Sequence, residues 1–245
     1  MIKQGALNGI DMIFGWHNWP AIPFGKMICP DELVMCGNGT FRISVNGQGG
    51  HASQPELCRD PVLAASAITL ALQQISSRRL APQQTAVISV TSIDARSEPT
   101  IIPEQALISG SIRVPDQATR DQVNSLIKEI STETAASYGV TCEVEILPRY
   151  NATINHAIQA QQLRECWSVD NGENGFDQQL PLPVMASEDF SYYLQEIPGA
   201  FALIGNNDGD QHHSASCHNP QYDFNDQLIP LVTRLFSRLA GAPLP

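Results

Sequence analysis

Four segments in the middle of the chain have the pattern of β-strands: residues 41–47, 85–93, 104–114 and 140–147. In the first, Phe41, Ile43 and Val45 alternate with polar neighbours, which is the two-residue period of a half-buried strand. The last segment alternates in the same way. These patterns predict a sheet with one buried face.

Two helices are predicted between these strands. Asp60 is a candidate N-cap residue, Pro61 suits the first helical position, and an apolar helix is predicted to run to about Arg79. Apolar residues recur at helical spacing between residues 123 and 130, and Gly139 provides a stop signal. The resulting order, β-α-β-β-α-β, is the split ferredoxin-like arrangement, and it occupies residues 36–148.

The segments on either side of this module predict a second domain. Residues 10–17 and 200–205 have the character of strands, while residues 155–169 and 228–239 have helical patterns. A further helix is predicted in "SEDFSYYL", with Ser187 as its cap and two acidic residues in its first turn. We therefore expect an α/β domain, formed by residues 1–35 and 149–245, into which residues 36–148 are inserted.

Composition and charge exclude some classes of function and partner. Acidic residues exceed basic residues by 25 − 14 = 11, which argues against nucleic acid or an anionic membrane as partner. No apolar run approaches the length of about 18 residues that a membrane span needs, and the N-terminus lacks the features of a signal peptide. The six cysteines form no C-x-x-C pair, so we expect free thiols and a cytoplasmic protein.

Three histidines are candidates for chemistry. His17 lies in "GWHNWP" at the end of a predicted strand, and His218 lies in "SCHNPQYDFND" just before the last predicted helix. His51 follows three glycines in "NGQGGHASQP", where the backbone can approach another group closely. Taken singly, each is more often a structural histidine than a ligand or a catalytic group.

Four motifs together are more specific than any of these histidines. "GWHNWP", "GGHASQP" followed by "DPVLAA", "MASEDFSYYL" and "CHNPQYDFND" occur in this order. In this the chain resembles the metal-dependent amidohydrolases that include hippurate hydrolase, N-acyl-amino-acid deacetylases and plant auxin-conjugate hydrolases. They belong to the aminoacylase and carboxypeptidase-like metallopeptidases. The resemblance implies a zinc-peptidase-like catalytic domain with an inserted ferredoxin-like lid, which also forms a homodimer.

The resemblance also implies a metal site. Such enzymes hold two divalent ions, zinc or manganese, that activate a bridging water against an amide carbonyl. His17 and His218 match metal ligands of the family. His51 matches a histidine on the lid that donates a hydrogen bond to the developing oxyanion, often across the dimer interface.

Four further residues are implied to surround the substrate. Arg113 matches a position suited to a substrate carboxylate, with a surface arginine on a strand edge as the alternative. Asn18, beside His17, is a candidate substrate-binding residue. Glu188 and Asp189 are candidates for orienting the metal ligands or the substrate, with helix capping as the alternative.

Two expected motifs are missing. The chain contains neither the family's Cys-Gly-His-Asp run nor a pair of adjacent glutamates, one of which serves as the general base. We therefore expect the chain to lack the first third of the family's sequence and to form an incomplete catalytic domain. The leading hypothesis is hydrolysis of an N-acyl, mainly N-acetyl, amino acid to a carboxylate and the free amino acid. The alternative is a catalytically inactive, truncated remnant that retains a dimerisation domain.

Overall fold

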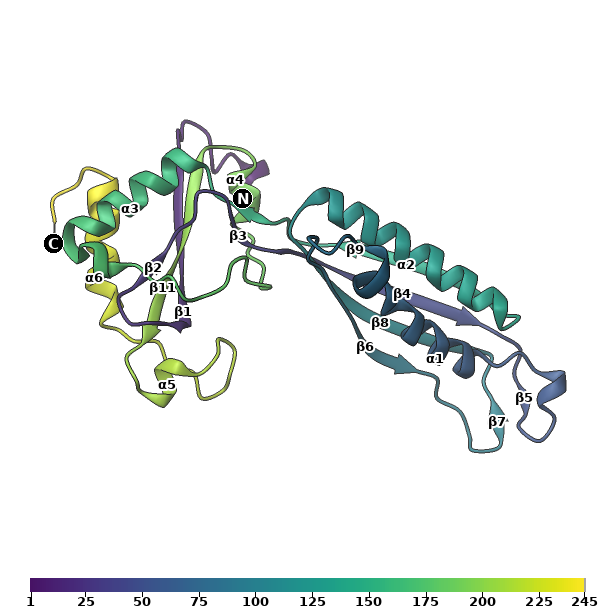
Figure 1. Ribbon diagram of the computed structural model, residues 1–245. Coiled ribbons are helices and arrows are strands. Elements are labelled where there is room, and N and C mark those ends of the chain that lie inside the picture. The colour runs from purple at the N-terminus through teal and green to yellow at the C-terminus, as the bar shows by residue number, and fades with distance from the viewer. Residues whose placement is uncertain (245) are drawn as a thin grey trace. The chain divides into compact units, whose positions relative to one another are not determined.

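The structure, a computed structural model, describes residues 1–244 and divides into two compact units. The first unit combines Met1–Met35, Ala152–Val184 and the residues from Glu188 onward, and the second combines Cys36–Asn151 with Met185–Ser187. Figure 1 shows the chain leaving the first unit after β3 (Leu33–Met35) and returning to it near β10 (Thr153–Ile154). These two short strands pair with each other within the first unit.

The second unit contains an antiparallel sheet with the strand order β6-β8-β4-β9. Its strands are β4 (Gly37–Asn46), β6 (Val87–Asp94), β8 (Gln105–Val114) and β9 (Thr141–Pro148). The helices α1 (Pro61–Leu72) and α2 (Gln117–Ser137) complete the order β-α-β-β-α-β along the chain. Mixed α/β structure is thereby confirmed, and both edges of this sheet, β6 and β9, lie open within the unit.

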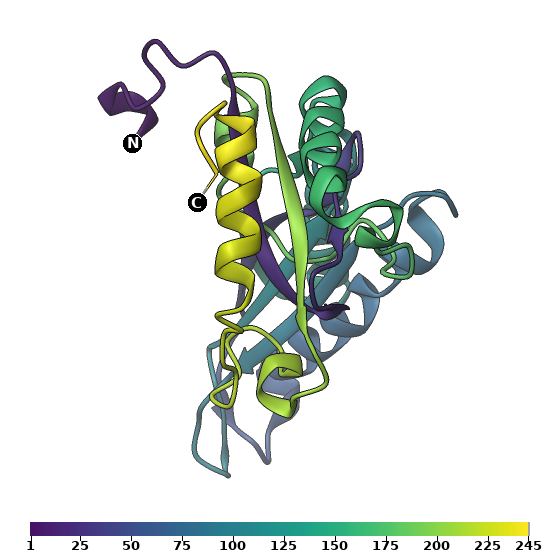
Figure 2. The same cartoon turned by 90° about the vertical axis from the view of Figure 1, so that its left-hand side faces the viewer.

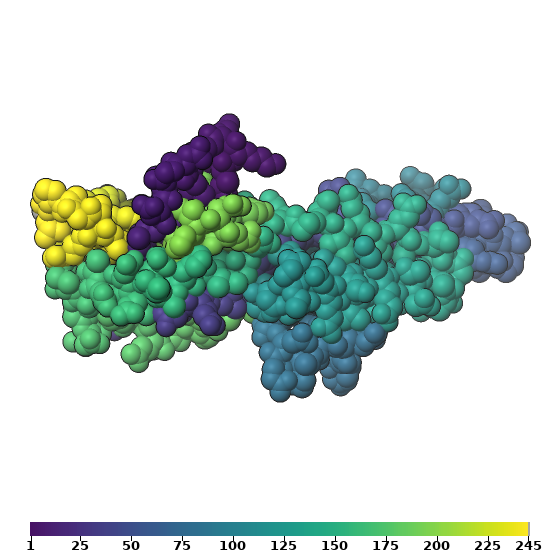
Figure 3. All heavy atoms as spheres, turned by 90° about the horizontal axis from the view of Figure 1, so that it is seen from above, coloured from purple at the N-terminus to yellow at the C-terminus, as the bar shows by residue number. Residues whose placement is uncertain are grey.

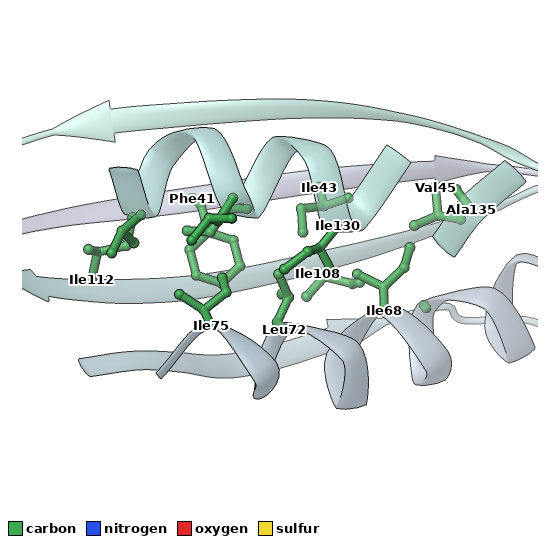
Figure 4. Packing of buried hydrophobic residues seen from close by; sticks show 14 of the residues in the cluster. Phe41, Ile43, Val45, Ile68, Leu72, Ile75, Ile108, Ile112, Ile130 and Ala135 are labelled. Atoms are coloured by element: carbon green, nitrogen blue, oxygen red, sulfur yellow. The ribbon is translucent and has the colours of Figure 1, made fainter. Parts of the chain in front are cut away.

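The core of the second unit lies between the sheet and its two helices (Figure 4). Phe41, Ile43 and Val45, which alternate in the sequence, are all fully buried. Gly110 on β8 makes room for the ring of Phe41, because a Cβ atom there would lie 2.1 Å from Phe41 Cζ. Packing therefore requires glycine at this position, although a glycine inside a strand otherwise weakens the strand.

In the second unit the helix ends follow the sequence signals. The Asp60 carboxylate accepts hydrogen bonds from the N–H groups of Val62 (2.8 Å) and Leu63 (3.2 Å), which confirms its N-cap role. The helix predicted to run to about Arg79 does extend that far, but its regular α-helical part ends at Leu72 and Ile75–Arg79 form a π-helical turn. An i→i+5 bond from Leu80 N–H to the Ile75 carbonyl (3.0 Å) widens this turn.

The first unit is built on a three-stranded sheet with the order β1-β11-β2. β1 (Ile13–Pro23) runs parallel to β11 (Gly199–Asn207), and β2 (Met27–Ile28) is antiparallel to β11. The helices α3 (Ala157–Asn171) and α6 (Leu228–Leu239) lie beside this sheet (Figure 2) and share a core with it. Trp167 is the largest side chain of this core, and its indole N–H donates to the Gly175 carbonyl at 2.8 Å.

The residues before β1 lie on the surface of the first unit (Figure 3), and none of them is buried. They include a short 3-10 helix, Ile2–Gln4. None of the helices described in residues 1–244 combines the length and the apolar character that a bilayer span requires.

Candidate functional site

β1 positions His17 and Asn18. In the parallel ladder with β11, His17 lies opposite Leu203 and Asn18 opposite Ile204. Upstream on the same strand, Gly15 leaves space for the Phe190 ring, since a Cβ atom there would lie 2.7 Å from that ring. The candidate residues therefore stand on a strand that is held by regular backbone pairing, which suits a site that needs fixed geometry.

The hydrogen bond of His17 determines which ring nitrogen is free. His17 Nδ1 lies 2.6 Å from the backbone carbonyl oxygen of Asn18. A carbonyl oxygen only accepts hydrogen bonds, so Nδ1 carries the proton and the lone pair of Nε2 is free. Metal-binding histidines commonly donate their second N–H to a carbonyl in this way. Trp19 meets the ring edge-on, with centroids 5.9 Å apart.

Tyr222 is a site residue that the sequence analysis did not identify. The Asn18 side-chain amide donates a short hydrogen bond to the Tyr222 hydroxyl, and the Cys217 thiol lies beside the same amide, with its Sγ 4.0 Å from Asn18 Nδ2. Burial raises the pKa of Tyr222, so its hydroxyl stays protonated. The only available signal was its place in "CHNPQYDFND", four residues after His218.

His218 occupies the loop between β11 and α6. Among residues 1–244 it is the one non-glycine residue with positive φ, 69°, and its side chain is exposed. Histidine is among the residues that tolerate this left-handed conformation. The loop places the His218 side chain through an uncommon backbone conformation, a feature that clusters at functional sites.

The predicted helix cap at Ser187 is wrong. The helix α4 spans Ser191–Leu194, its N-cap position is Phe190, and no side chain caps it. Ser187 Oγ instead accepts a hydrogen bond from Arg113 at 3.0 Å. Glu188 and Asp189 precede the helix, so helix capping does not account for them.

Glu188 lies close enough to His17 for their charges to interact. Burial raises the pKa of Glu188, while the Asp189 N–H, which donates to Glu188 Oε1 at 3.0 Å, and the His17 charge act in the opposite direction. Asp189 itself is exposed. The structure therefore places the Glu188 carboxylate within electrostatic range of His17 in the first unit.

These residues do not complete a metal site. Within residues 1–244 no group of three or more His, Cys, Asp or Glu side chains is arranged to hold a metal ion. A zinc site needs at least three protein ligands. The free Nε2 of His17 fits a metal ligand, but the described residues supply only part of a ligand set.

A polar network anchors the loop that carries His218. Asp208 pairs with His213 Nδ1 at 2.9 Å and accepts from Asn225 Nδ2 at 2.9 Å. Asn206, which is fully buried, donates from its side chain to the His213 carbonyl and accepts from Asn225 N–H. His213 is half-buried in this network.

The network makes the order of this loop depend on pH. The hydrogen bond from His213 lowers the pKa of Asp208, and the same bond raises the pKa of His213. The contribution of the Asp208 carboxylate to the stability of the loop is therefore lost as the pH falls through its lowered pKa. The contribution of the charged His213 ring is lost as the pH rises through its raised pKa. Loop order should be greatest between these two values.

We expect Asp208→Asn to increase hydrogen exchange of the His212 and Asp223 amides, which the loop protects, about two- to tenfold at neutral pH. Exchange measured by mass spectrometry over a pH series checks this. Asp226→Asn, which removes an exposed carboxylate just outside the network, is the matched control. Equal exchange in the two variants would contradict the anchoring role.

His51 lies in the second unit, on a tightly built turn. β5 (Gly50–His51) pairs with β7 (Ile101–Ile102), and Ala52 N–H donates to the Thr100 carbonyl at 2.9 Å. The preceding glycines are sterically required: a Cβ at Gly47 would lie 2.1 Å from the Arg59 carbonyl oxygen, and one at Gly49 would lie 2.7 Å from that of Ile102. The His51 ring is exposed above this turn.

Arg113 lies on β8, an interior strand of the sheet, so the alternative of a surface arginine on a strand edge is wrong. It is half-buried, and its guanidinium donates one bond, to Ser187. The rest of its donor fork is compatible with binding a carboxylate.

Comparisons with known proteins identify the second unit. Residues 35–139 match the model of the peptidase dimerisation domain of the M20 family. This range covers β4 through α2 of the second unit. The match supports the dimerisation function that the β-α-β-β-α-β module was expected to have.

Similarity to relatives extends over both units. The chain is 33% identical over 244 residues to an IAA-amino acid hydrolase, ILR1-like 2, of Arabidopsis thaliana, covering 98% of this chain and 54% of the relative. It is 29% identical over 240 residues to N-acetylcysteine deacetylase of Bacillus subtilis, covering 98% of this chain and 61% of the relative. The chain thus spans little more than half the length of these curated relatives.

A solved structure is also similar to this chain over both units. The Bacillus subtilis protein YXEP, described as a dinuclear metal-binding peptidase of the M20 family, superimposes with a TM-score of 0.78 at 25% identity. The superposition covers 98% of this chain and 59% of YXEP. The similarity runs through both units and includes the dimerisation domain, so the chain is similar over its length to amidohydrolases and peptidases of the M20 family.

Proposed function

We propose that this chain forms part of a metal-dependent amidohydrolase that cleaves N-acyl, chiefly N-acetyl, amino acids into a carboxylate and a free amino acid. The observation that carries the proposal is the extent of the similarity, which covers 98% of the chain and both units. One relative is named for hydrolysis of IAA-amino acids and another for deacetylation of N-acetylcysteine. Both names describe cleavage of an amide formed by an amino acid.

Each candidate residue has a role in this proposal. His17, through its free Nε2, and His218 contribute to the binding of two divalent ions, zinc or manganese. Glu188, which interacts electrostatically with His17, is assigned to orienting the metal ligands, while Asn18 and Tyr222 form a hydrogen-bonded pair at the next position of β1. Asp189 is exposed and is assigned to substrate orientation.

Two residues of the second unit act on the substrate itself. His51 donates a hydrogen bond to the carbonyl oxygen as negative charge develops there, and such donors act mainly in the transition state. Arg113 binds the carboxylate of the amino acid through its planar fork. His51 therefore acts in the chemical step, and Arg113 acts in substrate binding.

The isolated chain should bind metal weakly. The described residues lack a group of three ligands, so we expect less than one zinc or manganese ion per chain after dialysis. Elemental analysis measures this directly. Two tightly held ions would show that residues such as Cys217 complete a site within this chain.

A chimera tests the activity. The segment of N-acetylcysteine deacetylase that the match leaves uncovered is fused to this chain, which corresponds to 61% of that relative. We expect the chimera to release free amino acid from N-acetyl amino acids in the presence of zinc or manganese. A folded, dimeric chimera without turnover would favour the alternative of an inactive chain that retains a dimerisation domain.

We also propose that the protein is a homodimer formed through β6 and α1 of the second unit. β6 is an open edge whose residues 87–93 carry no charge, whereas β9, the other edge, exposes Glu143 and Glu145. Uncharged open edges favour pairing with another strand. On α1, Leu63 and Leu70 are 56% and 75% exposed, which adds apolar surface on an element that contacts β6.

Leu70→Lys should weaken self-association at least about tenfold, because a charge would be buried at the proposed interface. Ile158→Lys is the matched control, since Ile158 is an exposed apolar residue, 68% exposed, on α3 of the first unit. Sedimentation velocity over a concentration series distinguishes the two variants. Equal dimer content would place the interface elsewhere.

A further inference from the structure

The backbone of the His51 turn is held from both ends. Gln54 N–H donates to the His51 carbonyl at 2.9 Å, which closes a four-residue turn. His51 also pairs with Ile101 across the short β5–β7 ladder. The Cα–Cβ bond of His51 therefore has a fixed direction, and only its ring remains to be oriented.

Ser53 makes two hydrogen bonds to the His51 ring at the same nitrogen. Its backbone N–H lies 3.1 Å from His51 Nδ1, and its hydroxyl lies 2.7 Å from that atom. A backbone N–H can only donate, so its bond favours the form in which Nδ1 is an acceptor, and the shorter bond from the hydroxyl favours the same form. In the neutral ring the proton is then on Nε2, on the side of the imidazole away from Ser53.

His17 shows the opposite arrangement. Its Nδ1 donates to a carbonyl oxygen and leaves the Nε2 lone pair free, whereas the Nδ1 of His51 accepts and leaves an Nε2–H. The first state suits a ligand for a cation, and the second suits a donor to an oxygen. The local backbone therefore prepares the two rings for different chemistry.

We propose that Ser53 is a positioning residue that fixes both the orientation and the Nε2–H tautomer of His51. With the other tautomer, a lone pair instead of a hydrogen would face the substrate's carbonyl oxygen, and the donor would be lost. A donor held in this way before the reaction needs no reorganisation when charge develops. That the acceptor is the substrate's carbonyl oxygen rests on the proposed function, while the tautomer rests on the turn alone.

Nuclear magnetic resonance of the full chain, labelled with ¹⁵N in its histidines, tests the tautomer. In wild-type protein the neutral His51 ring should show the pattern of a single Nε2–H tautomer. Ser53→Ala removes one of the two donors and should raise the population with Nδ1–H, whereas Ser53→Thr keeps the hydroxyl and should leave the spectrum unchanged. Ser53→Asp places an acceptor beside Nδ1 and should favour Nδ1–H further.

Two results would overturn the proposal: a wild-type ring in the Nδ1–H form, or Ser53→Ala spectra that equal those of wild type. The His17 ring serves as the internal reference, because its Nδ1–H form should be the same in all these variants. In the chimera, Ser53→Ala should lower kcat about two- to tenfold with little change in KM, and Ser53→Thr should restore it. An inactive chimera with the single tautomer present would count against the proposed function alone. An active chimera in which Ser53→Ala changes neither kcat nor the tautomer would count against this inference alone.

Discussion

His51→Ala in the chimera should lower kcat by about 10²–10³-fold, equivalent to about 2.7–4 kcal/mol, with a much smaller change in KM. The physical reason is that a donor to the developing oxyanion acts in the transition state and contributes little to binding the neutral amide. The ring is exposed above a turn that the backbone holds in place, so its removal should not disturb folding. Steady-state kinetics with N-acetyl amino acids gives both constants.

His51→Gln is the matched variant, because its amide N–H₂ can donate over a similar reach. We expect it to recover part of the lost kcat. If His51→Ala retained nearly full kcat, the glycine-rich turn would have only a structural role. In that case the assignment of His51 as a donor to the substrate would be wrong.

His17→Ala should reduce turnover of the chimera to the background of the assay. The substitution removes a metal ligand whose Nε2 is kept free by the bond from Nδ1 to the Asn18 carbonyl. Excess zinc or manganese should restore part of the activity, since weakened binding is overcome by mass action. Turnover measured together with metal content checks both statements.

His156→Ala is the control for this loss. His156 is exposed at the start of α3, and its ring bonds the backbone of Gly199. We expect the His156→Ala chimera to keep its metal and its activity. Full turnover and full metal content in His17→Ala would remove His17 from the ligand set.

Much of the fold could be predicted from local signals. The alternation at Phe41, Ile43 and Val45 and the cap at Asp60 act over a few residues, and the structure confirms them. The helix predicted to begin at Ser187 failed because the competing contact is distant along the chain. The Ser187 hydroxyl is used by Arg113, which lies on β8. No local pattern contains that information.

The candidate site was less accessible to sequence analysis for the same reason. Asn18 and Tyr222 meet only because β1 lies beside the loop that follows β11, and nothing in their spacing indicates this. The resemblance to a family pointed to His17 and His218, and their roles stay predictions. The hydrogen bonds that select the protonated nitrogen of His17 and of His51 depend on atomic positions, which a sequence does not contain.

The most direct test of metal-dependent amide hydrolysis is the rate of amino acid release by the chimera before and after chelation. We predict that dialysis against a chelator abolishes the release from N-acetyl amino acids and that zinc or manganese restores it, with two ions bound per chain at full activity. Release that persists after the metal is removed would contradict the account. So would a folded chimera that binds two ions and hydrolyses none of these substrates.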